Sequence, residues 1–362
     1  MRILDKYILK KIFSCYVFIL LVFIILYFII DISYSLSDIL KSKPAVSILV
    51  SYYLNMIPLI FLTVSPFSIP IAVFYTFGEL NRNNEILSMR ASGISILRIA
   101  FPVIFFAFMV SSASFIVQEK LLLTSQKKIE DIKIRFIKKD IVATSEEVNF
   151  AFTSGDMIFF AGKFSPREKT LYDVMIFKEN EKDNIATETF AKNVVYNGKE
   201  WLANNVMEYT LDEDGKNLGA PAYWKQKIVL LDEKPETLAF KKSILSQFAP
   251  LKILKKEMYQ LRKIKAIDKF VNLQIDYNRK MAEPFSNLFL VIGILPVALE
   301  IKKRRAAFSS LGTGVIFSFI YYTFMYFGLA LGKANIILPA FSPWLAPLFF
   351  VSVGISGLLF IK

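Results

Sequence analysis

The chain has no histidine and only one cysteine among its 362 residues. Without histidine it has no imidazole metal ligand, no histidine general base and no Ser-His-Asp triad. Cys15, inside an apolar run, leaves no partner for a disulfide and no thiolate cluster for a metal. A phosphate-binding Walker loop is also missing, because GLALGK at residues 328–333 has the wrong spacing and lacks the following Ser or Thr. We therefore expect no cofactor, no metal and no ATP hydrolysis by this chain.

What the chain has in abundance is apolar and aromatic side chains, 54% and 15% of the residues respectively. This composition predicts an integral membrane protein. The net charge of +13 then has a simple meaning, because basic residues in membrane proteins fix topology and meet anionic headgroups. Nucleic acid is not an expected partner.

Six apolar runs predict membrane-spanning helices, in a three-plus-three arrangement around a long polar region. The fourth run is short, and we expect it to continue from a helix that begins outside the membrane. The second run contains Pro58, Pro66 and Pro70, so we expect a kinked helix whose freed carbonyl groups are satisfied by neighbouring helices. The runs are 12–30, 49–77, 99–117, 284–299, 306–331 and 336–361. The predicted domains are therefore 1–117 with three spans, 118–282 outside the membrane, and 283–362 with three more.

Basic residues predict which side each loop occupies. They concentrate before the first span, in the 78–98 loop and in the 302–305 loop, whereas the opposite short loops hold only Lys41, Lys43 and Lys333. Both termini and the 78–98 loop are thus expected in the cytoplasm. The 118–282 region is expected on the exported side.

The exported region contains short runs with strand character between about residues 146 and 231. Asn197-Gly198 and Asp214-Gly215 are hairpin signals, and Gly155 and Pro166 mark further turns. These features predict an inserted all-β domain, a sandwich or an open roll. Its edge strands are either open to strands of another protein or blunted. Helices are expected over 251–261 and 268–281, the second leading into the fourth span.

The 78–98 loop, GELNRNNEILSMRASGISILR, carries charges of both signs between two apolar runs. An asparagine at 81, 83 or 84 is a good helix cap, Glu85 falls in the first turn, and Gly93 ends the helix. The sequence predicts a short polar helix held against the membrane, where a transporter receives force from a soluble partner. The alternative is an ordinary solvated loop.

Charged residues within the spans are few, and Asp31 and Glu300 stand at span ends. A proton-coupled transporter places an acid in mid-membrane, so energy for transport would come from a separate ATPase. Two other functions fit the same layout. One is a membrane-anchored scaffold whose β-domain recruits partners without transport, and the other is an enzyme acting on lipid headgroups.

Three segments and the overall layout resemble a known family. LDKYILKKIF opens the chain, FGELNRNNEILSMRASGIS forms the loop, and YNRKMAEPFS enters the fourth span. They are similar to the lipopolysaccharide export permeases LptF/LptG (YjgP/YjgQ), and SMRASG favours the LptG member.

The resemblance implies an inner-membrane protein of a Gram-negative bacterium that pairs with a second LptF/LptG-type permease above a dimer of an LptB-like ATPase. Its periplasmic domain would be a β-jellyroll that continues into LptC-like and LptA-like proteins, with lipopolysaccharide entering between the permeases. The loop matches the family's coupling helix, and Glu85 matches the acid that faces a basic groove of the ATPase. With Glu85 we group the neighbouring charges Glu79, Arg82 and Arg90.

An amphiphile with phosphates and acyl chains needs basic residues at headgroup level and apolar walls. Lys41 and Lys43 are candidate phosphate contacts, with headgroup contact as the alternative. Candidate wall residues are Phe28, Phe67, Phe317 and Tyr321. The alternative for each ring is contact with membrane lipid or a neighbouring helix.

Overall fold

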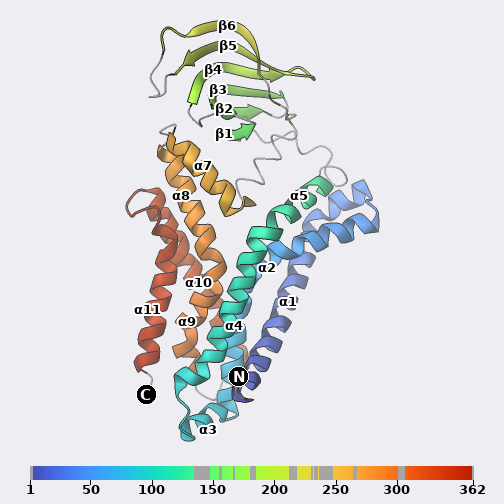
Figure 1. Ribbon diagram of the computed structural model, residues 1–362. Helices are drawn as coiled ribbons and strands as arrows, with labels where there is room; N and C mark the ends of the chain where they lie inside the picture. Colours follow the sequence, from blue (N-terminus) through green and yellow to red (C-terminus); the bar gives the residue numbers. More distant parts are fainter. Residues whose placement is uncertain are drawn as a thin grey trace. The chain divides into compact units, whose positions relative to one another are not determined.

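The computed structural model describes residues 3–133, 147–154, 157–165, 168–179, 185–211, 218–229, 231, 235, 248–263, 267–300 and 306–360. The chain divides into two compact units (Figure 1). The membrane unit comprises Met1–Ser37, Leu49–Gln126 and Ala249–Lys362, and the sheet unit comprises Asp38–Ile48 and Lys127–Phe248. The Lys/Arg cluster at 302–305, Gly155, Pro166 and the Asp214-Gly215 turn lie outside the described residues.

Six helical segments of the described chain are long and apolar enough to cross a membrane. This confirms the predicted fold class, a six-span helical membrane protein with an inserted β-domain. The helices before the sheet are α1 (Ile3–Ser42), α2 (Val46–Arg82), α3 (Glu85–Ala91), α4 (Ile96–Ile116), η1 (Val117–Leu121) and α5 (Leu122–Ile132). Those after it are α7 (Leu251–Lys263), α8 (Ile267–Ala282), η3 (Glu283–Phe285), α9 (Ser286–Leu299), α10 (Ala306–Lys333), η4 (Ser342–Trp344) and α11 (Leu345–Phe360).

The first two helices are longer than the apolar runs that predict them. α1 has 40 residues, about 60 Å at 1.5 Å per residue, roughly twice the hydrocarbon thickness. α2 continues past Phe77 to Arg82, since Leu80 still packs into the core. The predicted 78–98 loop therefore begins as helix.

One of the three prolines of α2 shows the predicted compensation by a neighbouring helix. Pro70 has no N–H, so the carbonyl of Pro66 loses its helical partner. The Ser318 hydroxyl of α10 lies 3.0 Å from that carbonyl oxygen and is fully buried. A neighbouring helix thus satisfies the freed acceptor, as helices within a membrane must.

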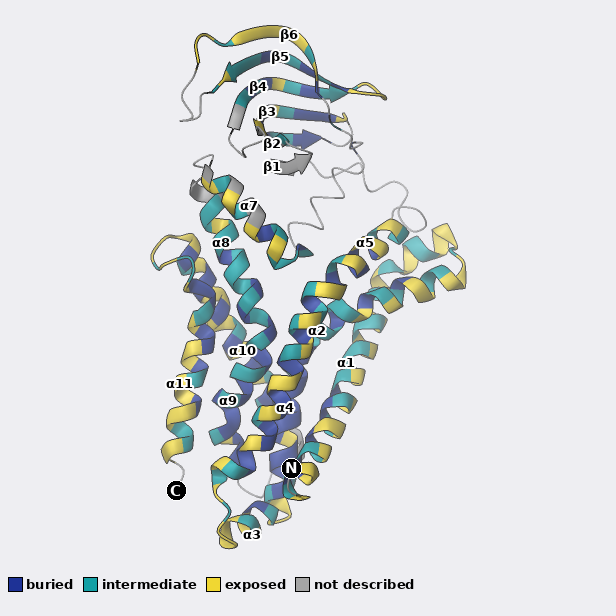
Figure 2. Cartoon of the chain, viewed as in Figure 1, coloured by how far each residue is buried: buried dark blue, intermediate teal, exposed yellow. Residues whose placement is uncertain are grey.

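Small residues let other spans approach closely. A Cβ on Gly314 of α10 would lie 2.7 Å from the Ile71 backbone of α2, and one on Gly354 of α11 would lie 2.2 Å from the Ile292 carbonyl oxygen of α9. Such sites are typical of helix contacts inside membranes. The core accordingly centres on α2, α4 and α9, dark blue in Figure 2.

A chain of buried polar groups also joins four of these helices. Tyr16 of α1 and Ser65 of α2 share a hydrogen bond of 2.8 Å, and Ser65 donates to Asn287 Oδ1 of α9 at 3.1 Å. Asn287 Nδ2 in turn donates to Ser114 of α4 at 3.3 Å. Buried polar groups need such partners, so this row of hydrogen bonds fixes how the four helices face one another.

A second junction forms where α4 leaves the apolar region. The Glu119 carboxylate of η1 accepts from the backbone N–H of Leu251, the first residue of α7, at 3.1 Å. Gln118 donates to the carbonyl of Lys280 in α8 at 2.8 Å, and Lys280 Nζ donates to the carbonyl of Ala249. The predicted helices over 251–261 and 268–281 are therefore present as α7 and α8 and are tied to the end of the third span.

The sheet unit holds one six-stranded antiparallel sheet in sequential order. Its strands are β1 (Glu147–Ser154), β2 (Met157–Ser165), β3 (Thr170–Glu179), β4 (Ile185–Tyr196), β5 (Trp201–Thr210) and β6 (Ala222–Val229). One face buries an apolar cluster that includes Phe159, Phe164 and Trp201. At the predicted Asn-Gly turn, Asn197 N–H donates to the Glu200 carbonyl and Gly198 has φ +96°. The described strands thus form a meander, one of the arrangements open to a small all-β domain.

Candidate functional site

The predicted helix of the 78–98 loop is α3, which lies between the ends of α2 and α4 (Figure 1). Asn84 precedes it with a left-handed φ of 57°, and its side chain makes no cap bond, so capping by asparagine is not how the helix begins. Gly93, with φ +80°, follows the helix as expected, and Ser95 caps α4 by accepting from the Arg98 N–H at 3.3 Å. α3 is thus a short helix between two tight turns.

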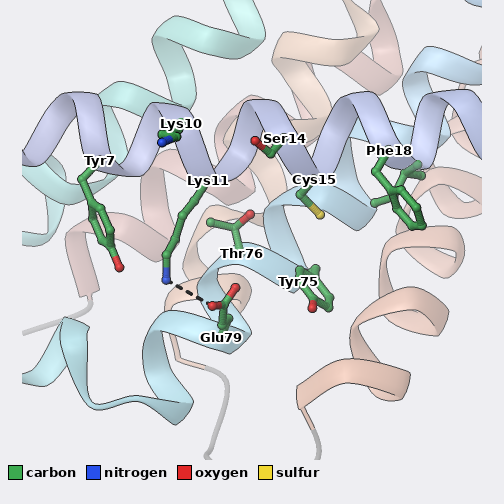
Figure 3. Close-up of a pocket in the computed structure, with 10 residues that line it drawn as sticks. Tyr7, Lys10, Lys11, Ser14, Cys15, Phe18, Tyr75, Thr76 and Glu79 are labelled. Carbon is green, nitrogen blue, oxygen red and sulfur yellow. Dashed lines mark hydrogen bonds and ion pairs between the residues drawn. The ribbon is translucent and has the colours of Figure 1, made fainter.

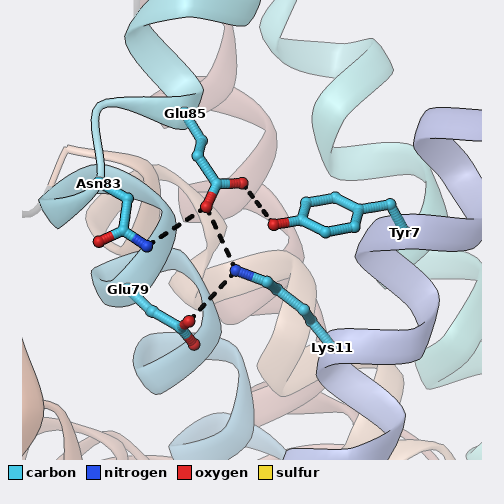
Figure 4. A network of polar contacts seen from close by, with 5 residues as sticks. All are labelled: Tyr7, Lys11, Glu79, Asn83 and Glu85. Carbon is cyan, nitrogen blue, oxygen red and sulfur yellow. Dashed lines mark hydrogen bonds and ion pairs between the residues drawn. The ribbon is translucent and has the colours of Figure 1, made fainter.

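The carboxylate of Glu85, in the first turn of α3, points toward α1 (Figure 4). Tyr7 Oη donates to Glu85 Oε2 at 2.7 Å, and Lys11 Nζ lies 3.3 Å from Glu85 Oε1. Lys11 also lies 3.2 Å from Glu79 Oε1 of α2, and Asn83 Nδ2 donates to Glu85 Oε1 at 3.3 Å. We call Tyr7, Lys11, Glu79, Asn83 and Glu85 the Lys11 network. It joins α1, α2 and α3 around one ammonium group.

The network keeps Glu85 ionised. Partial burial acts to raise the pKa of Glu85, but hydrogen bonds from Tyr7, Asn83 and Lys11 outweigh it and the net pKa is lowered. Side-chain exposures of 22% for Lys11 and 25% for Glu85 show a pair that is partly shielded from water. Such a pair is screened less than a surface ion pair.

A second ion pair holds the N-terminal turns of α1 to α4. Arg98 Nη2 lies 2.8 Å from Asp5 Oδ2, and the Asp5 side chain is only 6% exposed. A buried carboxylate needs such a partner because an unpaired one is costly. α1 is therefore connected to each of the three helices α2, α3 and α4 by polar groups within its first three turns.

A cavity of about 760 Å³ opens between α1 and α2 beside the network (Figure 3). Its α1 wall follows one helical face from Tyr7 to Ile19, and its α2 wall is Tyr75, Thr76 and Glu79. Most of the lining is apolar, while Lys10, Lys11 and Glu79 supply charge. On this face α1 is not packed against protein, so the polar contacts above hold its end in place.

The four residues predicted to contact an ATPase fall into two pairs. Glu79 and Glu85 both bind Lys11. Arg82 and Arg90 are exposed, and Leu87 of α3 is also exposed, at 61%. The outer face of α3 therefore carries an apolar and a basic side chain, and its acidic side chain faces inward.

Among the aromatic residues predicted for substrate contact, Phe317 and Tyr321 share one apolar cluster, and Phe67 reaches it through Tyr322. Lys41 and Lys43 are exposed near the end of α1, where Lys43 has a φ of 43°. Phe28 packs edge-on against Tyr53 at 5.2 Å, and Phe67 stacks on Tyr322 at 5.4 Å.

Phe317 and Tyr321 of α10 take part in packing within the chain. Phe317 lies 5.6 Å from the Phe74 ring. Tyr321 has no exposed surface and packs on Phe350, so its prediction as a wall residue requires correction. Its ring belongs to the contact between α10 and α11.

Sequence reasoning missed Tyr7 and Lys11 as site residues. Lys11 is one of the basic residues before the first span that predict topology, and it shares a helix face with Tyr7, four residues earlier. Their partners Glu79 and Glu85 lie 68 to 78 residues away. A useful signal was available, because two acids held against the membrane need a cation nearby.

A comparison with protein-family models matches residues 6–360 to the family described as lipopolysaccharide export system permease LptF/LptG. The chain belongs to the LptF/LptG family. The match covers both the membrane and sheet units, and its description includes both members of the family. A search of curated protein sequences found no match. Membership makes the chain a multi-pass membrane permease of the lipopolysaccharide export system.

Proposed function

We propose that this LptF/LptG permease is the membrane-spanning subunit of an ABC transporter in the inner membrane. It takes lipopolysaccharide from the outer leaflet and passes it to a periplasmic β-bridge. A second LptF/LptG-type permease forms the other side of the space that lipopolysaccharide enters, and a cytoplasmic LptB-like ATPase dimer supplies energy. LptC-like and LptA-like proteins continue the route from the sheet unit.

The proposal is supported mainly by the position and the contacts of α3. A seven-residue helix joins two spans, exposes Leu87 and Arg90, and is tied through Glu85 to a third span. An exposed arginine next to exposed apolar surface fits a protein interface, where arginine is enriched. A solvated loop needs neither such a surface nor the inward contacts.

The proposed roles in the 78–98 segment follow from where each side chain lies. Leu87, Arg82 and Arg90 form the surface that contacts the ATPase. Glu79 and Glu85 hold the segment to α1, and Glu85 remains the acid nearest to the partner. Because α2 and α4 continue directly from this segment, its displacement by the ATPase moves spans of the membrane unit.

The substrate route is proposed from chemistry. Lys41 and Lys43 offer ammonium groups for lipid phosphates at the end of α1. Phe28 and Phe67 are half-buried and supply apolar wall. Each acyl CH₂ moved into water costs about 0.8 kcal/mol, so a continuous apolar wall lowers the barrier that ATP hydrolysis must overcome.

Co-purification with the cell's LptB-like ATPase tests the proposal. Leu87→Glu places a carboxylate on the outer face of α3 and is expected to remove the ATPase from the detergent-solubilised complex. The matched control is Leu338→Glu, since Leu338 is 69% exposed in the loop after α10, predicted on the opposite side. A wild-type chain that never retains an ATPase would contradict the proposal, as would Leu87→Glu retaining it fully.

A further inference from the structure

The Lys11 network raises the question of how motion of α3 reaches the first span. α2 and α4 are covalently continuous with the loop that holds α3, whereas α1 is not. α1 touches the loop through side chains, with the Tyr7 hydroxyl and the Lys11 ammonium on Glu85. These polar groups therefore join α3 to α1, alongside the apolar cluster that Ile86 of α3 shares with Ile8 and Ile12 of α1.

α1 is also the span held least by packing. Only 11% of its most apolar window is buried within the chain, against 56% for α2 and 44% for the span that starts at α4. Its buried side chains follow one narrow stripe through Ile8, Ile12, Tyr16 and Ile19. The cavity in Figure 3 borders the adjacent face of α1 over the same turns. Among the six spans, α1 has the least apolar packing to overcome when it moves.

Lys11 is placed to couple displacement of α3 to movement of α1, because its ammonium contacts two acids on different helices. Its ammonium lies 3.2 Å from Glu79 of α2 and 3.3 Å from Glu85 of α3 (Figure 4). When α3 moves, Lys11 can keep Glu85 and loosen Glu79, or keep Glu79 and loosen Glu85. In both arrangements the ammonium stays paired. Glu85 also keeps its bonds from Tyr7 and Asn83, and Glu79 is the more exposed acid, so releasing Glu79 costs less.

The Asp5–Arg98 pair lies one turn before this site on α1. The Asp5 carboxylate is almost fully buried, and its ion pair with Arg98 fixes the start of α1 against α4. A pull on Tyr7 and Lys11 therefore acts next to a fixed point. The rest of the helix, from Ser14 onward, lies beyond these contacts and is held by Tyr16 and Ile19 on its buried stripe.

Resting on the proposed function, we propose that Tyr7 and Lys11 are positioning residues of the transport cycle, which transmit displacement of α3 to α1 through Glu85. Glu85 then acts within the permease as well as next to the ATPase. α1 changes its angle to α2 as α3 moves, and the face that α1 turns toward the second permease changes with it. Lys10, one residue away, makes no ion pair within the described residues and has no part in this transmission.

The test uses the assembled complex of both permeases and the ATPase in proteoliposomes containing lipopolysaccharide. Three quantities are measured: ATPase retained, ATP hydrolysed and lipopolysaccharide extracted. Lys11→Met is expected to retain the ATPase and its hydrolysis but to lower extraction per ATP by about tenfold or more. Lys11→Arg keeps the charge and should restore extraction, and the matched control Lys10→Met should leave it unchanged.

A charge exchange separates the two roles of Glu85. In the double variant Lys11→Glu with Glu85→Lys, the pair between positions 11 and 85 keeps opposite charges with the signs exchanged, and the new glutamate stands beside Glu79. Extraction should recover relative to Glu85→Lys alone. Tyr7→Phe provides a milder variant that keeps the ring and removes the hydroxyl donor, and it should lower extraction without loss of ATPase.

The outcomes are distinct. Equal extraction by Lys11→Met and Lys10→Met, or loss of the bound ATPase in Lys11→Met and Tyr7→Phe, would overturn transmission through α1. No recovery in the exchanged double variant would also count against it, because Glu85 would then act on the ATPase alone. A wild-type complex without ATP-dependent extraction would overturn the proposed function, and the transmission proposal with it.

Discussion

At the scale of single residues, the Lys11 network shows how few groups connect α1 to α3. Glu85 receives hydrogen bonds from three side chains, whereas Glu79 has the Lys11 contact. The two acids are therefore not equivalent, although their sequence positions suggest similar roles. Glu85 is the residue whose loss disconnects the helix.

The protonation of Glu85 gives a prediction about pH. Partial burial raises its pKa, but the hydrogen bonds prevail and the pKa in the folded chain falls below its ordinary value of 4.5. A lowered pKa contributes stability that is complete above the ordinary value and is lost as the pH falls through the lowered one. The extraction ratio of wild type to Lys11→Met should thus stay constant from about pH 8 to about pH 5. A ratio that falls between these values would contradict this assignment.

The lysines at the end of α1 give a second prediction at this scale. Lys41→Glu with Lys43→Glu should weaken photocrosslinking of lipopolysaccharide to the end of α1, because phosphates are then repelled. Lys333→Glu is the matched control, as another exposed lysine at the end of a span helix. Crosslinking that is unchanged in the double variant would remove both lysines from the route.

At the scale of elements, close helix contacts depend on single glycines. Gly314→Ala puts a methyl group against the Ile71 backbone and should cost about 1–3 kcal/mol. Gly312→Ala is the control, because it lies on the same helix with open space around it. Thermal unfolding in detergent should show a lower Tm for the first variant and an unchanged or slightly higher one for the second.

The junction at the end of the third span gives another element-scale prediction. Glu119→Gln weakens the acceptor at the start of α7 and should cost about 0.5–2 kcal/mol, as loss of a helix cap does. Faster amide hydrogen exchange in α7, with unchanged exchange in α9, is the expected readout. Equal exchange in wild type and variant would show that Glu119 does not hold α7.

Elements were the level at which the sequence was most informative. Apolar runs predicted all six spans, because hydrocarbon imposes a length on each. They did not predict that α2 continues to Arg82, since a helix need not end where hydrocarbon does. They also misassigned Tyr321, because a span that is apolar on every side does not reveal which face meets protein.

Long-range pairs were the part that the sequence could not supply. α3 was predicted from its turn residues and charges, which are local signals. The partner of Glu85 depends on how α1 and α2 pack, and Tyr7 stands 78 residues away. The sequence alone does not show that packing, so in it Lys11 is only one of several basic residues before the first span.

At the scale of the whole molecule, the topology is testable because the chain has a single cysteine. In a Cys15→Ser background, Ser88→Cys on α3 and Lys199→Cys in the β4–β5 turn are both exposed positions. An impermeant thiol reagent added to intact spheroplasts should label Lys199→Cys, and Ser88→Cys only after lysis. The reverse pattern would invert the predicted orientation.

The sequence separation within the Lys11 network has a consequence for how the protein is made. Glu79 and Glu85 follow Lys11 by 68 and 74 residues, which is roughly 3 to 15 seconds of synthesis at 5–20 residues per second. During that interval the first helix is inserted without the acids that later bind it. The ion pairs form only after the second helix and α3 have emerged, so a first helix bound through Lys11 belongs to a chain whose first two spans and α3 have already been made.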